Sequence, residues 1–150
     1  MVGVFIGIGV GPGDPELLTL KAAKTLKTVN TICVPKSHTN RPSMALGMIQ
    51  TVLTARKTPA DILELVFPMS RDDLNNRKLW AENASIVAKK VKQGNVAFIT
   101  LGDPMLYSTF LYLYEFLKET CPEIELEIIP GVTSVTAVAA QSKLPLAEQD

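Results

Sequence analysis

Histidine and cysteine are scarce in this chain of 150 residues, which has one histidine and two cysteines. The cysteines, Cys33 and Cys121, lie far apart and form no metal-binding motif with His38, so no metal site is expected. A single histidine in a polar loop also makes a Ser-His-Asp triad implausible. Cysteines without a disulfide framework are typical of a reducing compartment, and we expect a cytoplasmic protein.

An excess of charge is also missing, because fifteen basic residues balance fifteen acidic ones and neither kind is clustered. This balance argues against nucleic acid or an anionic membrane surface as the main partner. No apolar run is long enough to span a bilayer. The apolar start, residues 2–10, is interrupted by Gly3, Gly7 and Gly9 and has no basic lead-in, so it predicts a buried strand and not a signal peptide.

What the chain does have is a high apolar content, 47% of its residues, arranged in short runs that alternate with helical patterns. Strands are expected at residues 4–10, 31–34, 62–67, 96–100 and 126–129, with Pro35 and Pro68 ending the second and third. Helices are expected at 20–26, 43–52, 70–94, 109–118 and 133–141. This order predicts an α/β domain with a five-stranded, mainly parallel sheet and helices on both faces.

Two of the predicted helices carry recognisable ends. Thr19 is a plausible N-cap of the first helix. The longest helix opens with a capping-box pattern at Ser70 and Asp73 and ends at Gly94. One face of that helix is apolar and predicts core packing; it carries Trp80, Ala84, Val87, Ala88 and Val91.

Three loops that follow predicted strands have the composition of a ligand site. Ligands of an open parallel sheet bind at the carboxyl ends of its strands, so these loops could share one site. The first, GVGPGDP at residues 9–15, lacks the third glycine and the later acidic residue of a dinucleotide fingerprint, and it is no P-loop. Its glycines allow close approach of a ligand, but a tight strand-to-helix turn without any ligand explains the same residues.

The second loop, TLGDPMLYST at residues 100–109, combines a turn signal with apolar side chains and two hydroxyls. Such a mixture suits a small amphipathic ligand. The third, IPGVTS at residues 129–134, places Thr133 and Ser134 at the start of the last helix. Either hydroxyl could cap that helix, or it could hold a polar group of a ligand together with free backbone N–H groups.

Taken together, the three loops resemble the motifs of one family, the tetrapyrrole methylases. GVGPGDPELLT at residues 9–19 is similar to the opening motif, GDP at 102–104 to the second, and PGVTS at 130–134 through LPL at 144–146 to the third. The finer pattern resembles the precorrin-2 C-20 methyltransferases of that family. It consists of LVFPM at 65–69, Trp80, and GDPMLYSTF at 102–110.

The resemblance implies methyl transfer from S-adenosylmethionine to C-20 of precorrin-2 or cobalt-precorrin-2, in cobalamin biosynthesis. It further implies a homodimeric enzyme of two domains, with the cofactor between them. Residues 1–150 would be the N-terminal domain alone, without the C-terminal domain, and would be inactive by themselves. The residues implied to bind the cofactor are Pro12, Gly102, Asp103, Leu106, Tyr107, Ser108, Thr133 and Ser134.

The resemblance leaves the catalytic residues unknown, including the group that accepts the proton from C-20. Candidates to meet the carboxylates of a tetrapyrrole are Lys36, Arg41, Arg71 and Arg77, although all four could be ordinary surface residues. Another tetrapyrrole methylase, acting on uroporphyrinogen III or a later precorrin, is an alternative. A methylase of protein side chains, such as a diphthine synthase, fits the opening motif less well. A metabolite-binding domain without catalysis is a further alternative.

Overall fold

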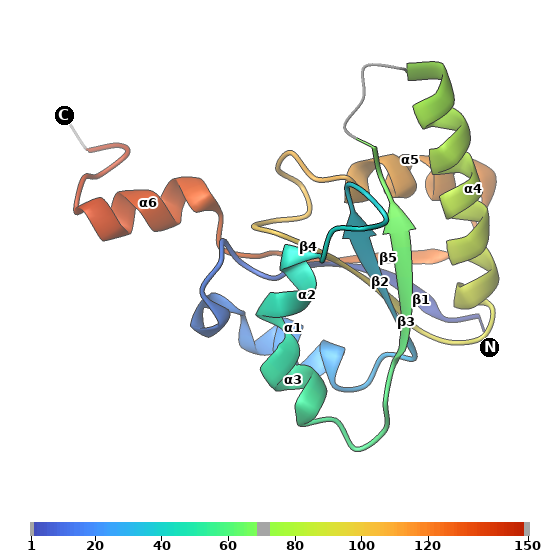
Figure 1. Cartoon of the computed structure of the whole chain (residues 1–150), viewed down its shortest axis with the longest axis horizontal. Helices are drawn as coiled ribbons and strands as arrows, with labels where there is room; N and C mark the ends of the chain where they lie inside the picture. Colours follow the sequence, from blue (N-terminus) through green and yellow to red (C-terminus); the bar gives the residue numbers. More distant parts are fainter. Residues whose placement is uncertain (1, 69–72, 149–150) are drawn as a thin grey trace.

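A computed structural model of the chain describes residues 2–68 and 73–148 (Figure 1). Its five strands form one sheet in the order β3-β2-β4-β1-β5, and every neighbouring pair is parallel. The strands are β1 Val4–Gly9, β2 Thr31–Lys36, β3 Asp61–Val66, β4 Val96–Thr100 and β5 Glu125–Ile129. The predicted fold class is confirmed, and the sheet is wholly parallel.

The helices cover both faces of this sheet (Figure 1). The elements between strands are the short 3₁₀ helix η1 Pro15–Leu17, followed by α1 Leu20–Leu26, α2 Met44–Met48, α3 Gln50–Thr54, α4 Asp73–Val91 and α5 Phe110–Thr120. One core cluster joins α1, α2 and α3 to one face, and a second joins α4 and α5 to the other. The last helix, α6 Ser134–Ser142, stands away from both layers and has no buried residue.

The central strands are apolar because both of their faces are covered. All five residues of β4 are buried. Along β1, Phe5 belongs to the cluster under α4 and α5, whereas Ile6 and Ile8 belong to the cluster under α1 to α3. Gly7 leaves room for the Phe110 side chain, because a Cβ on Gly7 would lie only 2.5 Å from the Phe110 ring.

The long helix packs as its sequence pattern predicts. Ala84, Val87, Ala88 and Val91 are buried on α4, and half-buried Trp80 packs against the same core and stacks on Tyr112 at 3.8 Å between ring centroids. The predicted core role of this face is therefore confirmed. The capping box cannot be followed, because Ser70 lies outside the described residues.

Two predicted boundaries are wrong. Pro35 does not end the second strand, which runs on to Lys36. β4 pairs with β2 only as far as Cys33, so at Pro35 the strand β2 is hydrogen-bonded to β3 alone. Because proline is tolerated at an edge position of a sheet, the missing N–H of Pro35 does not end the strand. The helix expected at 43–52 is divided into α2 and α3, with Ile49 between them in a non-helical conformation.

Helix starts agree better with the sequence. Thr19 caps α1, because its hydroxyl accepts a hydrogen bond from the backbone N–H of Ala22 at 3.1 Å.

Within residues 2–68 and 73–148, no helix combines the length and the apolar character needed to cross a membrane.

Candidate ligand site at the carboxyl ends of the strands

The three loops singled out by the sequence meet at one edge of the sheet, because β1 lies between β4 and β5. From this edge the chain leaves β1 towards α1 on one face, and it leaves β4 towards α5 on the other. A crevice at the carboxyl ends of the strands is expected where neighbouring connections diverge in this way. The site is therefore a product of strand order, which brings residues far apart in sequence together.

The first and second loops are joined by backbone hydrogen bonds. Gly102 N–H donates to the Gly11 carbonyl at 2.7 Å, and Gly11 N–H donates to the Gly102 carbonyl at 3.4 Å. Gly11 has φ +84° and Gly102 has φ +64°, a backbone conformation that glycine adopts with little penalty. These two glycines thus fix the junction between the loops.

The third loop closes over the same junction. A Cβ on Gly9 would lie 2.5 Å from the Gly102 carbonyl oxygen and 2.7 Å from Gly131 Cα. A Cβ on Gly131 would collide with the same Gly102 oxygen. Glycine is needed at both positions for close approach of three backbones, and this explains part of the motif spacing.

Asp103 ties the second loop to the third. One carboxylate oxygen accepts from the Met105 N–H at 2.8 Å, and the other accepts from the Gly131 N–H at 2.9 Å. Both oxygens are thus used to hold backbone amides. Asp103 acts first as a positioning residue for the junction, whatever else it contacts.

Two of the predicted hydroxyl residues also have structural partners. Thr133 caps α6, accepting from the Thr136 N–H at 3.2 Å. Ser108 is buried; its hydroxyl donates to the Thr100 hydroxyl at 2.9 Å and accepts from the Phe110 N–H at 3.1 Å. The capping alternative for Thr133 is confirmed, whereas Ser134 is exposed and is one of the residues that line a pocket.

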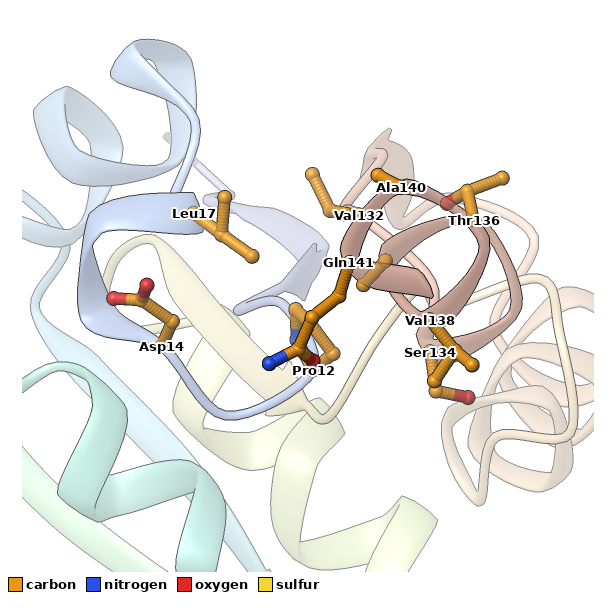
Figure 2. A pocket seen from close by; sticks show the side chains of 10 residues that line it. Pro12, Asp14, Leu17, Val132, Ser134, Thr136, Val138, Ala140 and Gln141 are labelled. Carbon is orange, nitrogen blue, oxygen red and sulfur yellow. The ribbon is translucent and has the colours of Figure 1, made fainter. Parts of the chain in front are cut away.

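That pocket has a volume of about 710 Å³ and lies between the first loop and α6 (Figure 2). Pro12, Asp14 and Leu17 form one side. The other side consists of Val132 and the α6 residues Ser134, Thr136, Ala137, Val138, Ala140 and Gln141. Its walls are mainly apolar, with the Asp14 carboxylate as their charged group. Hereafter it is called the Pro12 pocket.

Two further pockets are lined by residues of the β4–α5 loop and by none of the residues of the Pro12 pocket. The larger, about 650 Å³, extends from Phe67 and Trp80 to residues 105–109 and Tyr112. The smaller, about 310 Å³, lies beside the end of β2 and includes Lys36 and Ser43. Both are bounded by Tyr107, Ser108 and Thr109, and we call them the Tyr107 pockets.

The structure thus divides the eight predicted cofactor residues into groups. Pro12 and Ser134 line the Pro12 pocket, while Leu106, Tyr107 and Ser108 line the Tyr107 pockets. Gly102 and Asp103 belong to the glycine junction, and Thr133 caps α6.

Sequence reasoning missed the contribution of α6 to the pocket wall. The signal that could have found it is the composition of residues 134–142, which carry no charge and consist mainly of alanine, valine and small hydroxyl residues. Such a composition predicts burial in general and gives no indication that the helix would line a pocket instead.

The four cations proposed for carboxylates have different surroundings. The side chain of Lys36 is largely buried. Its Nζ lies 2.8 Å from the Thr39 carbonyl oxygen and 3.1 Å from a Glu64 carboxylate oxygen. Arg41 and Arg77 are exposed, with Arg77 beside the Trp80–Tyr112 stack. Arg71 lies outside the described residues.

Neither the histidine nor the buried cysteine of the chain belongs to the junction. His38 is exposed in the loop after β2, as predicted. Burial raises the pKa of the Cys33 thiol to about 12, so it is an inert core residue near neutral pH. Among residues 2–68 and 73–148 no three His, Cys, Asp or Glu side chains are grouped to hold a metal ion. The site offers apolar walls, backbone groups and carboxylates.

Comparison with known proteins agrees with the motifs. The family model of the Tetrapyrrole (Corrin/Porphyrin) Methylases matches residues 4–150. A protein of Methanocaldococcus jannaschii named probable cobalt-precorrin-2 C(20)-methyltransferase is 45% identical over 145 residues, 96% of this chain. The cobalt-precorrin-2 C(20)-methyltransferase of Salmonella typhimurium is 38% identical over 148 residues, 98% of this chain. The chain spans 59% and 60% of the lengths of these relatives.

Among solved structures, the uroporphyrin-III C-methyl transferase of Thermus thermophilus in complex with S-adenyl homocysteine is similar to the chain. Its TM-score is 0.60 at 26% sequence identity, and the match covers 98% of this chain and 54% of that one. The similarity therefore extends through the whole α/β domain described above.

Proposed function

Because the chain belongs to the tetrapyrrole (corrin/porphyrin) methylase family, we propose that it takes part in methyl transfer from S-adenosylmethionine to C-20 of a precorrin-2 tetrapyrrole. The observation that carries this proposal is the convergence of the GVGPGDP, GDP and PGVTS loops on one glycine junction between pockets. The names of the two relatives support the cobalt-loaded substrate and a role in cobalamin biosynthesis.

The residues at the junction fit S-adenosylmethionine in chemistry. The cofactor is amphipathic, with a sulfonium, an ammonium and a carboxylate group beside its apolar parts. The Pro12 pocket has mainly apolar walls with a few polar side chains, which suits such a ligand. We assign its binding to Pro12, Gly102, Asp103, Thr133 and Ser134. Leu106, Tyr107 and Ser108, predicted together with them, line the Tyr107 pockets and not the Pro12 pocket.

When bound, S-adenosylmethionine supplies a methyl group that is electrophilic because it is attached to a positively charged sulfur. The chain's own contribution is alignment, which can lower a barrier by several kcal/mol when reacting atoms are held about 3 Å apart. Asp103 serves this purpose by fixing the Met105 and Gly131 amides. The proton released from C-20 passes to a group that we do not assign.

We also propose that a second domain completes the site, and that the protein is a homodimer in the cytoplasm. The exposed α6 and the open Pro12 pocket support the first point, together with the greater length of the relatives. Balanced charge and free cysteines fit a cytoplasmic enzyme with a small-molecule substrate, and neither nucleic acid nor a membrane is proposed as a partner.

The test is to incubate the complete protein with cobalt-precorrin-2 and S-adenosylmethionine labelled with ¹³C in its methyl group. We expect a single labelled methyl, which NMR assigns to C-20. A label at another carbon would identify a different tetrapyrrole methylase, and binding of S-adenosylmethionine without transfer would favour a metabolite-binding domain. Uroporphyrinogen III serves as the control substrate and should stay unlabelled.

A further inference from the structure

Tyr107 has an unusual backbone at the apex of the β4–α5 loop. Its φ is +50°, in the left-handed region, where the Cβ of an L-residue crowds the neighbouring carbonyl oxygen. At the other two sharp turns of the junction, Gly11 and Gly102, the chain uses glycine for the same conformation. A bulky aromatic residue at this position therefore works against the stability of the loop.

The fold does not compensate for this strain by burying the side chain. Tyr107 is 100% exposed, and its neighbours Met105 and Leu106 are 51% and 43% exposed. The loop stands free at the carboxyl edge of the sheet, between α6 and the body of the domain (Figure 1). Strained residues of this kind are concentrated at ligand sites, where the conformation serves recognition.

The position of Tyr107 relative to the pockets indicates which ligand it meets. It borders both Tyr107 pockets and does not line the Pro12 pocket, which lies across the Gly11–Gly102 junction. In an in-line displacement the acceptor atom and the leaving sulfur must lie on opposite sides of the methyl group. If the cofactor occupies the Pro12 pocket, the acceptor belongs on the side of Tyr107.

We infer that Tyr107 is a substrate-binding residue on whose ring a face of the tetrapyrrole lies; this inference rests on the proposed function. A tetrapyrrole is broad and unsaturated, and an aromatic ring offers it a large contact with few rotatable bonds to order. The left-handed backbone fixes the direction of that ring. Exposed Met105 and Leu106 extend the apolar surface along the same loop.

The experiment uses Tyr107→Gly, Tyr107→Asn and Tyr107→Phe in the complete protein. Glycine and asparagine tolerate the left-handed backbone but remove the ring, so each should raise the Tm, by about 2–4 °C for glycine. Both should raise KM for cobalt-precorrin-2 about tenfold and leave KM for S-adenosylmethionine within about twofold of wild type. Tyr107→Phe keeps the ring and should retain the wild-type KM.

Lys143 provides a matched control, because it is the other non-glycine residue with positive φ in the described part of the chain, at +57°. It follows α6 and lines none of the three pockets. Lys143→Gly should raise the Tm in the same way without a change in either KM.

The outcomes separate this inference from the proposed function. If wild type transfers methyl to the tetrapyrrole while Tyr107→Gly and Tyr107→Asn keep the wild-type KM, Tyr107 is not a substrate contact. A KM that rises for S-adenosylmethionine instead assigns the ring to the cofactor and overturns the inference. Impaired binding by Tyr107→Phe would assign recognition to the hydroxyl and also overturn it. Absence of transfer by wild type overturns the proposed function itself.

Discussion

Asp103 accepts hydrogen bonds from two backbone N–H groups at once. For holding these two groups, the presence of two acceptor oxygens matters more than the negative charge of the side chain. The Met105 and Gly131 amides point at different carboxylate oxygens. An asparagine has a single carbonyl oxygen, so one of these amides would face an NH₂ group. An unpaired amide of this kind costs about 1–3 kcal/mol where it is shielded from water.

We therefore predict that Asp103→Asn resembles Asp103→Ala in the complete protein. Both should lower the urea midpoint and weaken S-adenosylmethionine binding by about tenfold in calorimetry. Asp14→Asn is the matched control for stability, since Asp14 accepts only from the Glu16 N–H at 2.9 Å and asparagine caps equally well. A wild-type affinity in Asp103→Ala would remove Asp103 from the proposed site.

At the scale of elements, the features predicted correctly are those with local causes. Thr19 and α1, the buried face of α4, and the bounds of β4 follow from caps and periodicity within one segment. The error at Pro35 has a long-range cause. Whether Pro35 ends a strand depends on where β4 stops pairing with β2. The residues around Pro35 give no information about that point.

The loop motifs illustrate the same distinction. Their glycines could be identified as sites of close approach, but the partners in that approach could not. Gly9 faces Gly102 and Gly131 because β1 lies between β4 and β5, and strand order does not follow from strand patterns alone. For the same reason, the pattern of residues could not predict that Pro12 and Tyr107 line different pockets.

The convergence of loops leads to a prediction about Gly9→Ala. Its methyl group would lie within 2.7 Å of backbone atoms of both other loops, so the junction must separate. We expect a loss of about 1–3 kcal/mol in the free energy of unfolding, measured by urea denaturation, and loss of S-adenosylmethionine binding. Gly47→Ala in α2 is the control, because a Cβ there meets nothing within 4 Å. Equal stability of the two variants would contradict the proposed close packing.

At the scale of the whole molecule, α6 is the one helix of at least eight residues in the described part of the chain that packs into neither core cluster. The sheet is covered on both faces, yet Val135 and Val138 on α6 are 53% and 62% exposed, and Leu144 and Leu146 beyond it are similarly open. A helix of this composition is usually buried against another element. Its exposure fits a site of which residues 1–150 form one wall.

The second domain proposed above leads to a prediction about activity. Expressed alone, residues 1–150 should fold, because the two core clusters lie entirely within them, and circular dichroism should show the α/β content. They should nevertheless transfer no methyl group to cobalt-precorrin-2, since one side of the Pro12 pocket consists of the unsupported α6 and water can enter freely. The longer Salmonella typhimurium relative, assayed under the same conditions, shows that the substrates are competent. Turnover by residues 1–150 would mean that the three loops align donor and acceptor without a second wall, and the two-domain arrangement proposed above would be wrong.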